Sequence, residues 1–406
     1  MIRIGLIGKT NTGKTTFFNA ATLLSAKVST YPFTTKQPNI GIAYVQTTCV
    51  CKEFRVKDNP KNSVCINGWR FIPIELIDLP GLIKGAHLGR GLGNQFLSVA
   101  MQADALLHVV DASGSIDAEG RICEPGLGNP IADFYEVEYE LIEWFKRVLK
   151  LNRNRIERMT KTGKQNIVDA LHKVFSGMKV TKQHIIDALK ASNLEDKAFW
   201  NWNEDDYNKF SLELRIRAKP TLIVANKMDL GPSEENYEKL VKEFGRAFVV
   251  PCSAEAELSL RRAEKLGLIE YVPGMEMFRV IDESKLTPKQ KWALQYVQRR
   301  VMGKIFRTGV QQALNIAVFK LLRMNVIYPV EDPKRLSDKH GNVLPDALLM
   351  PPNSTVLDLA REIHSELAKG FIYAIDVRTG IRLPKDYILR DRDVISIVSA
   401  TKEKKK

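Results

Sequence analysis

A glycine-rich loop near the start of the chain constrains the fold more than any other feature. Its residues, Gly8-Lys9-Thr10-Asn11-Thr12-Gly13-Lys14-Thr15, match the pattern G-x-x-x-x-G-K-[ST]. An apolar run, Ile2–Ile7, precedes the loop, and helix-compatible residues, Lys14–Leu24, follow it. A strand, a glycine loop and a helix in this order predict a P-loop, in which backbone N–H groups and a helix N-terminus hold phosphates.

Within this loop, individual side chains have predicted roles toward a nucleotide. We expect Lys14 to reach the β- and γ-phosphates and the Thr15 hydroxyl to bind Mg²⁺. The predicted nucleotide contacts of the loop are Gly8, Thr10, Asn11, Thr12, Gly13, Lys14, Thr15 and Thr16.

A second motif, Asp78-Leu79-Pro80-Gly81, directly follows the apolar run Ile74–Ile77. A carboxylate at a strand end with a glycine three residues later has the spacing to hold Mg²⁺ while the glycine N–H senses a γ-phosphate. The motif therefore predicts Asp78 as a Mg²⁺ ligand together with Thr15, and Gly81 as a γ-phosphate contact.

A third motif predicts which base is bound. Leu222–Ala225 leads into Asn226-Lys227-Met228-Asp229, and a carboxylate there can accept hydrogen bonds from the N1–H and 2-amino group of guanine. Adenine presents neither donor, and a buried polar group without a partner costs about 1–3 kcal/mol. We therefore expect GTP and GDP to bind in preference to ATP. The predicted contacts on this side are Asn226, Lys227, Met228, Asp229, Ser253 and Ala254, with the Ala254 N–H directed at guanine O6.

The motifs follow apolar strands, which predicts a fold class. Polar motifs at the carboxyl ends of strands are typical of a doubly wound, mostly parallel α/β sheet that binds its ligand along that edge. The predicted organisation is a G domain at 1–112 and 219–275, an α-helical insertion at 113–218, a helical linker at 276–322 that completes the G domain, a small α+β module at 323–400 with one amphipathic helix over 355–368, and a disordered tail at 401–406.

Charge favours a polyanionic partner. The 61 Lys and Arg against 47 Asp and Glu give a net charge of +14, which fits RNA or a ribosome or, equally, solvated basic faces. The region 146–190 is the most basic part of the insertion. We expect no sequence-specific contact with DNA.

Cysteine usage and hydropathy bear on location. Five cysteines without paired C-x-x-C spacing are too few for a disulfide framework and favour a reduced, cytoplasmic interior. Cys49 and Cys51 form a lone C-x-C, interpreted as strand or loop residues rather than metal ligands. No apolar stretch approaches 18 residues, so no membrane segment is expected.

Segments between the motifs resemble the Obg family of translation-factor-related P-loop GTPases. The resemblance rests on Tyr31-Pro32-Phe33-Thr34-Thr35 with Pro38-Asn39, and on Asp78 to His87 continuing from Gly91 to Leu97. The large insertion and a carboxyl-terminal segment resembling a TGS domain, a β-grasp module shared with threonyl-tRNA synthetases, are similar to the YchF-like subgroup. This resemblance implies a β-grasp fold for 323–400, a switch GTPase that docks on the ribosome, and Thr35 as a Mg²⁺ and γ-phosphate contact.

One departure from the subgroup concerns the base. Bacterial and eukaryotic YchF-like proteins resemble ATP users whose fourth motif lacks the Asp, whereas Asp229 is present here. Three functions stay open at this point: a ribosome-associated switch GTPase, an NTPase that accepts ATP, and an RNA-binding module in which the nucleotide is structural.

The hydrolytic apparatus is also open. Leu82 occupies the position where many GTPases have a water-orienting glutamine, so another group must act or hydrolysis is slow. His87 is one candidate to orient water, or is an ordinary loop histidine. Asn11 occupies a position that in related GTPases is associated with a bound K⁺. The catalytic candidates are Lys14, Thr35, Gly81, His87 and Asn11.

Overall fold

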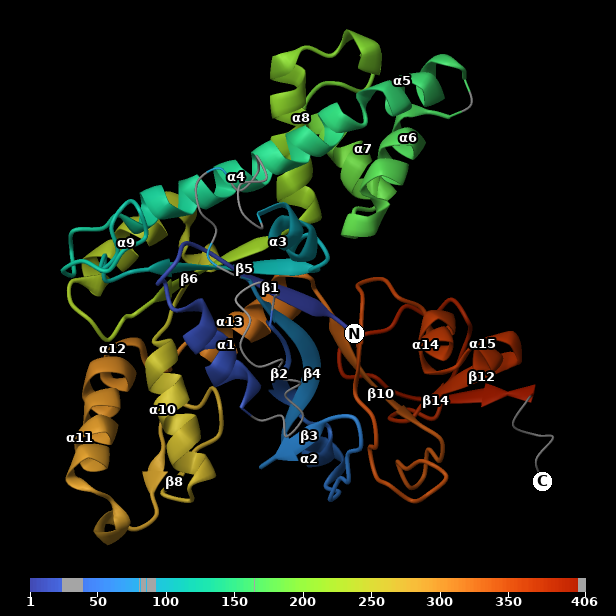
Figure 1. The fold of residues 1–406 in the computed structure, drawn as a ribbon. Helices are drawn as coiled ribbons and strands as arrows, with labels where there is room; N and C mark the ends of the chain where they lie inside the picture. The colour runs from blue at the N-terminus through green and yellow to red at the C-terminus, as the bar shows by residue number, and fades with distance from the viewer. Residues whose placement is uncertain (24–38, 80, 82–84, 86–92, 164, 401–406) are drawn as a thin grey trace. The chain divides into compact units, whose positions relative to one another are not determined.

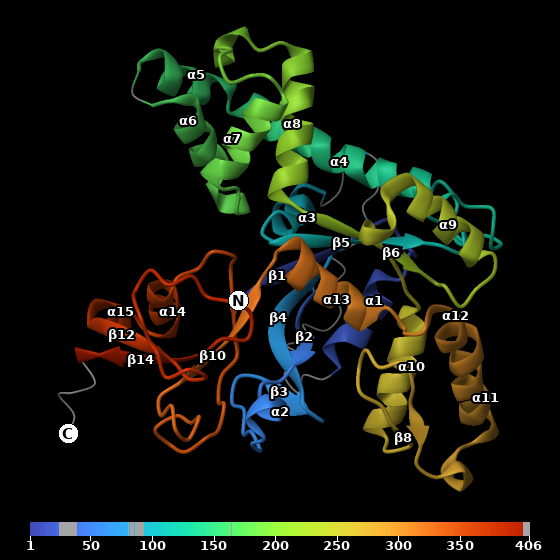
Figure 2. The same cartoon turned by 180° about the vertical axis from the view of Figure 1, so that it is seen from behind.

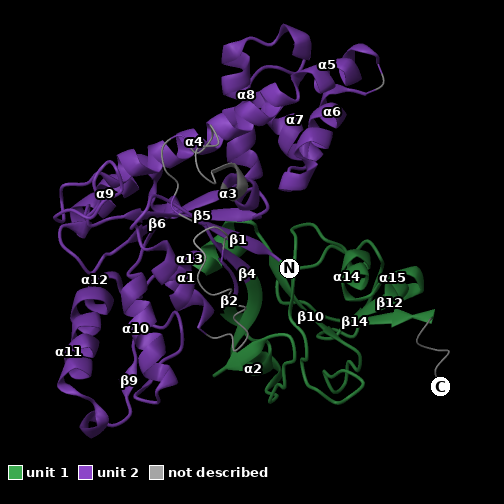
Figure 3. Ribbon diagram, in the orientation of Figure 1, with its two compact units in different colours: residues 1, 44–74, 314–406 green, residues 2–43, 75–313 purple. Residues whose placement is uncertain are grey.

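The computed structural model describes residues 1–23, 39–79, 81, 85, 93–163 and 165–400, without the side chains of 93–96. Figure 3 shows the two compact units into which the chain divides. Unit 1 contains residue 1, residues 44–74 and residues 314–406, and unit 2 contains residues 2–43 and 75–313. The predicted domain boundaries are not decided by this division and stay predictions.

A parallel sheet built on the predicted apolar runs forms the centre of unit 2 (Figure 1). The strands belong to a seven-stranded sheet of order β2-β4-β1-β5-β6-β7, in which β3 (Val64–Ile66) pairs antiparallel with β4 and β2 (Asn39–Thr48) lies at the edge. The pairings from β4 to β7 are all parallel. Strand β5 is buried along its whole length, as expected for a strand covered on both faces. The strands are β1 (Arg3–Ile7), β4 (Trp69–Asp78), β5 (Ala105–Asp111), β6 (Thr221–Asn226) and β7 (Val249–Pro251). The predicted doubly wound, mostly parallel sheet is confirmed.

Helices account for most of the remainder of unit 2 (Figures 1 and 2). Helix α1 follows the P-loop and lies beside α10, while α4 lies beside α8. The helices of unit 2 are α1 (Lys14–Thr22), α3 (Gly93–Ala100), α4 (Pro130–Leu151), α5 (Arg153–Lys161), α6 (Ile167–Phe175), α7 (Lys182–Ala191), α8 (Glu204–Ala218), α9 (Ser233–Phe244), α10 (Ala254–Lys265), α11 (Pro288–Val297) and α12 (Gly303–Ile305). A short antiparallel pair, β8 (Ile269–Glu270) and β9 (Arg279–Val280), follows α10.

Helices α4 to α8 form where the sequence predicts a helical insertion. The Asn129 side chain accepts hydrogen bonds from the N–H groups of Ile131 and Ala132 and so begins α4. Large apolar side chains from these helices, including Phe145, Phe175 and Phe210, join the sheet residues in one buried cluster. Packing of this aromatic cluster stabilises the insertion on the sheet.

Unit 1 combines a loop region with the carboxyl-terminal module. Residues 44–74 include parts of β2 (Asn39–Thr48) and β4, with α2 (Cys51–Phe54) and β3 (Val64–Ile66) between them. The module is a five-stranded sheet of order β11-β10-β14-β12-β13 that packs around Ile327, Leu359 and Ile397. Its elements are β10 (Asn325–Val330), β11 (Leu348–Met350), α14 (Val356–Ile363), α15 (Ser365–Lys369), β12 (Phe371–Asp376), β13 (Arg382–Leu383) and β14 (Val394–Ser399). Helix α13 (Val310–Ile316) runs from unit 2 into unit 1.

The prediction of one helix over 355–368 is wrong in one respect. His364 is extended, at φ −167° and ψ 135°, and ends α14. Its side chain then accepts a hydrogen bond from the Glu366 N–H and begins α15. The histidine thus supplies a cap that hydropathy alone does not reveal. Within the described ranges, no helix is both long enough and apolar enough to cross a bilayer.

Candidate functional site

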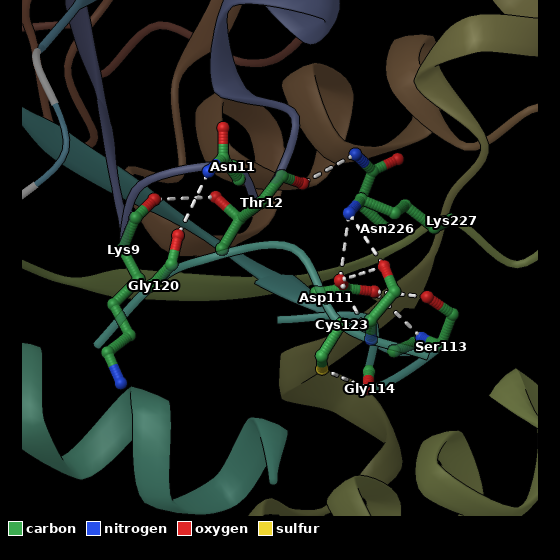
Figure 4. Close-up of polar contacts among 12 residues, drawn as sticks. Lys9, Asn11, Thr12, Asp111, Ser113, Gly114, Gly120, Cys123, Asn226 and Lys227 are labelled. Carbon is green, nitrogen blue, oxygen red and sulfur yellow. Dashed lines mark hydrogen bonds and ion pairs between the residues drawn. The ribbon is translucent and has the colours of Figure 1, made fainter. Parts of the chain in front are cut away.

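The P-loop connects β1 to α1 at the carboxyl edge of the sheet in unit 2. Gly8 has φ 142°, and a Cβ at this position would lie 2.3 Å from the Val109 carbonyl oxygen. Gly13 has φ 95°, and a Cβ there would lie 2.2 Å from Asn226 Nδ2. Figure 4 shows the Thr12 hydroxyl donating to the Lys9 carbonyl oxygen at 3.1 Å inside the loop. Both predicted glycines therefore occupy positions that a larger residue cannot.

Lys14 is buried at the start of α1, with its Nζ donating to the Lys9 carbonyl oxygen. Burial lowers the pKa of Lys14 to about 8, and the nearby Asp78 carboxylate partly offsets that effect. Because a buried ammonium has lost much of its hydration, an anionic phosphate beside it would be bound strongly.

Thr15 and Asp78 meet although 63 residues separate them, and the Thr15 hydroxyl donates to Asp78 Oδ2 at 2.9 Å. Asp78 is 4% exposed, and burial raises its pKa against the opposing effects of the Thr15 hydrogen bond and Lys14. Its Oδ1 has no hydrogen-bond partner among the described residues. Two hard oxygen ligands at this point, one of them without a partner, fit Mg²⁺.

Gly81 lies directly against the P-loop. A Cβ on Gly81 would lie 2.7 Å from the Thr10 nitrogen, so only glycine permits this approach. On another side of the loop, Asn11 Nδ2 and the Thr10 hydroxyl both donate to the Gly120 carbonyl oxygen, at 2.9 and 3.2 Å. Asn11 has φ 62°, which directs its amide toward residue 120 (Figure 4).

Asn226 joins the P-loop to the loop that follows β7. Its Nδ2 donates to the Thr12 carbonyl oxygen at 2.9 Å, and its Oδ1 accepts from the Ala254 N–H at 3.0 Å. The Ala254 N–H is thus engaged by Asn226, and its predicted role toward guanine O6 stays a prediction.

The other residues of the third motif are held by separate partners. Lys227 Nζ contacts Asp111 Oδ2 at 2.8 Å, as Figure 4 shows. The Ser253 hydroxyl donates to Asp229 Oδ1 at 2.7 Å, and the Tyr296 hydroxyl donates to the Asp229 carbonyl oxygen at 3.0 Å. Met228 is buried in an apolar cluster at the sheet. Asp229 is therefore oriented by two hydroxyls.

A pocket of about 220 Å³ lies between the P-loop and the third motif. It is lined by Gly13, Thr16, Asn226, Lys227, Asp229, Leu230, Ala254 and Glu255. Two motifs more than 200 residues apart in sequence thus line one cavity, as a nucleotide that spans phosphate and base contacts requires.

Comparisons with known proteins agree with this geometry. Three family models match the chain. A 50S ribosome-binding GTPase model matches residues 3–142, and a model of the G4 motif-containing domain of YGR210-like, Obg-like GTPases matches residues 224–332. A TGS domain model matches residues 340–399. An uncharacterized GTP-binding protein of Methanocaldococcus jannaschii is 46% identical over 99% of this chain and 100% of its own length. The chain belongs to the Obg family of P-loop GTP-binding proteins, in its YchF-like subgroup.

A solved structure and a further relative also resemble this chain. A GTP-binding protein from Pyrococcus horikoshii has a solved structure with a TM-score of 0.78 and 34% identity, covering 98% of this chain and 100% of its own. A Bacillus subtilis protein named ribosome-binding ATPase YchF is 31% identical over 64% of this chain and 68% of its own length. The family resemblance predicted from the sequence is confirmed, including the carboxyl-terminal TGS domain. The chain is therefore a nucleotide-binding protein of a class of nucleotide hydrolases.

Several predicted site residues of this Obg-family protein fall outside the described residues. They are Thr35 with its neighbour Thr34, Leu82 and His87. Their predicted roles, as Mg²⁺ ligand and as water-orienting group, stay predictions.

The structure adds residues that the motifs did not indicate. Asp111 ends β5 and binds Lys227, and Asp133 of α4 binds Lys9 Nζ at 2.8 Å. Gly120 accepts from the P-loop, while Glu255 lines the pocket. A signal for Asp111 was present, because it is a carboxylate at the end of an apolar strand, as Asp78 is. Nothing in the sequence signals Asp133 or Gly120, because their contacts depend on tertiary structure.

Proposed function

We propose that this Obg-family protein is a switch GTPase that hydrolyses GTP with Mg²⁺ and binds guanine selectively. The observation that carries this proposal is the meeting of three motifs in unit 2: Thr15 of the P-loop donates a hydrogen bond to Asp78, and the P-loop and Asp229 line one pocket. A site of this kind holds a nucleoside triphosphate by its phosphates and its base together.

Mg²⁺ would be held by the Thr15 hydroxyl and the Asp78 carboxylate. The free Asp78 Oδ1 and the 2.9 Å contact between these residues support that assignment. When bound, the ion supplies positive charge at the β- and γ-phosphate oxygens. The protein's own contribution is to hold the phosphates with the P-loop N–H groups and the Lys14 ammonium, and to hold Gly81 beside Thr10 for the γ-phosphate.

Guanine selectivity would come from Asp229. Its carboxylate, oriented by Ser253, can accept from guanine N1–H and the 2-amino group, whereas adenine offers an acceptor at N1. An unpaired carboxylate facing that acceptor would cost about 1–3 kcal/mol or more. The intact Asp229 supports GTP even though the Bacillus subtilis relative is named an ATPase.

Hydrolysis needs a group in place of the missing glutamine. Asn11 supports a K⁺ ion as one solution, because its Nδ2 is engaged by Gly120 while the described structure gives its Oδ1 no partner. The amide oxygen is then available to a monovalent cation near the phosphates. His87 is the second candidate, as a neutral imidazole that orients water.

Docking on a ribosome or RNA is the proposed use of the switch. The support is the net charge of +14, the match to the ribosome-binding GTPase model and the name of the Bacillus subtilis relative. In the basic region 146–190, several lysines form ion pairs with neighbouring carboxylates. Four cations there have no ion pair among the described residues: Arg155, Arg158, Lys173 and Lys190. These four exposed cations are the proposed phosphate contacts.

The test is calorimetric binding of GDP, a non-hydrolysable GTP analogue and the matching ATP analogue, followed by turnover assays. We expect guanine to be preferred by about a hundredfold or more, turnover to require Mg²⁺, and K⁺ to accelerate it relative to Na⁺. Equal affinity for both analogues would instead favour an ATP-accepting enzyme. RNA binding with the same affinity in the GTP-bound and GDP-bound protein would favour an RNA-binding module in which the nucleotide only stabilises the fold.

A further inference from the structure

Three thiols and one carboxylate gather in unit 1, and none of them lines the nucleotide pocket. One ligand atom from each of Cys49, Cys51, Asp58 and Cys65 lies within 4.8 Å of every other. Cys49 follows β2, Cys51 begins α2, Asp58 lies in the next loop and Cys65 lies in β3. All four belong to the same compact unit.

The distances between these atoms fit tetrahedral coordination of a metal ion rather than a disulfide bond. The Sγ atoms of Cys51 and Cys65 are 3.9 Å apart, and Cys49 Sγ is 3.2 Å from Asp58 Oδ2. Zn–S bonds of about 2.3 Å in a tetrahedron put two sulfurs about 3.8 Å apart. A disulfide needs about 2.05 Å, and all of these cysteines are free thiols. We propose that Cys49, Cys51, Cys65 and Asp58 bind one structural zinc ion.

Local backbone geometry positions two of the ligands, Cys49 and Cys65, before any ion binds. Asn67 and Gly68 both have positive φ, 52° and 75°, and form the two-residue turn between β3 and β4. The Cys49 N–H donates to the Gly68 carbonyl oxygen at 2.9 Å, which fixes the end of β2 beside this turn. Cys65 pairs with Arg70 across the hairpin. A preformed set of ligands lowers the entropic cost of capturing a metal.

Charge in the surroundings also suits a metal bound by thiolates. Three thiolates and a carboxylate around a divalent ion leave two negative charges, which would be costly to bury alone. The fully buried Arg70 guanidinium lies 3.2 Å from Asp58 Oδ2 and neutralises one of them. Its other hydrogen bonds, to the Ser63 hydroxyl and the Leu344 carbonyl oxygen at 3.0 Å each, hold it in place.

Tyr328 packs against the arginine that contacts the proposed ligand Asp58. Its ring lies under the Arg70 guanidinium, 5.3 Å from it, and its buried hydroxyl has no hydrogen bond within the described chain. Through Arg70, which contacts Asp58 Oδ2 at 3.2 Å, the Tyr328 ring lies next to the proposed ligands. Groups that donate to the ligands of a metal orient them and tune the site. The ion would thereby fasten the loop 49–66 to β10 of the carboxyl-terminal module, within unit 1.

The test uses the full-length protein purified without chelators or added metal. Elemental mass spectrometry is expected to find one zinc per chain, and thiol titration after unfolding with a chelator is expected to find five free thiols. Replacement by Co²⁺ is expected to give the intense visible bands of tetrahedral cobalt and a thiolate charge-transfer band. These three measurements need no variant, so a misfolded mutant cannot obscure them.

Variants then assign the ligands. Cys65→Ser and Asp58→Asn are expected to lower the bound zinc or alter the cobalt spectrum, whereas Cys123→Ser, a cysteine outside the cluster, is expected to retain both. A metal-free protein overturns the proposal, whether it has five thiols or only the three that a Cys51–Cys65 disulfide would leave. Iron in place of zinc, or full zinc in Cys65→Ser, overturns it equally.

Discussion

At the P-loop, the phosphate end of the site, burial lowers the pKa of Lys14 and raises that of Asp78, and Asp78 Oδ1 has no partner among the described residues. At the base end, Asn226 is hydrogen-bonded through both atoms of its amide, and Asp229 is oriented by Ser253 at 2.7 Å. The phosphate end thus has a polar atom without a hydrogen-bond partner in the described chain, whereas the polar groups of the base end are hydrogen-bonded within the protein.

This difference separates two sources of binding energy. Groups that are buried and weakly paired gain most when phosphates and Mg²⁺ arrive, so the phosphate end should dominate affinity. Groups that are already oriented lose little entropy on binding and reject ligands of the wrong pattern, so Asp229 at the base end should determine selectivity. Variants at the two ends are therefore expected to differ in kind as well as in size.

The largest expected effect is on selectivity, in Asp229→Asn. The amide presents a donor where guanine needs an acceptor, so affinity for GDP should fall about a hundredfold or more, while affinity for the ATP analogue changes little. Calorimetry with both ligands measures this difference. Glu255→Gln removes a carboxylate that also lines the pocket and is the matched control, expected to keep the preference. The same loss in both variants would show that net charge, and not base pairing, is responsible.

Asn226→Ala is expected to have the next largest effect on nucleotide affinity, and the loss should be the same for guanine and adenine nucleotides. It leaves the Thr12 carbonyl oxygen and the Ala254 N–H without their partner, at about 1–3 kcal/mol for each buried group. Part of this cost is expected to appear in binding, because the ligand must then hold the two loops in place. Affinity for GTP and ATP analogues should fall together by about ten- to a hundredfold, or about 1.4–2.8 kcal/mol. If only the guanine ligand weakens, Asn226 contacts the base and does not serve mainly to join the two loops.

Sequence alone predicted the parts of this site that local patterns carry. Gly8 and Gly13 in the loop between β1 and α1, and the strand before Asn226, follow from motifs with fixed spacing, whereas the roles of Thr15 and Asp78 toward Mg²⁺ stay predictions. The hydrogen bond from Asn226 to Thr12 and the contact of Lys227 with Asp111 do not follow from a motif, because they depend on which loops meet in the folded protein.

The cysteines illustrate the same limit. The C-x-C of Cys49 and Cys51 indicated no metal site by itself, because the other two members, Asp58 and Cys65, have no standard spacing from it. Only the hairpin that turns at Gly68 brings Cys65 back to Cys51. The break of the predicted carboxyl-terminal helix at His364 likewise follows from a cap and not from hydropathy.

A smaller effect is expected from pH at the phosphate end. The pKa of Lys14 is about 8 in the free protein, and a bound phosphate would raise it, so binding takes up a proton above that pH. GDP affinity should then fall about fourfold from pH 7 to 8.5, as the protonated fraction falls. Calorimetry in buffers of different ionisation enthalpy measures the proton uptake. Lys14→Arg keeps its charge and should bind with no such dependence, whereas an equal slope in that variant would assign the titration to another group.

The smallest expected effect is in Ser253→Ala, which tests how far the base end depends on its internal hydrogen bonds. The change removes the hydroxyl that donates to Asp229 Oδ1 but keeps the carboxylate, which is half-buried and open to a replacing water. Guanine affinity should fall about two- to threefold, near 0.5 kcal/mol, with the ATP analogue unaffected. Competition binding of the two nucleotides resolves a change of this size. A loss as large as that in Asp229→Asn would mean that the orientation of the carboxylate, and not its presence alone, determines which base this protein accepts.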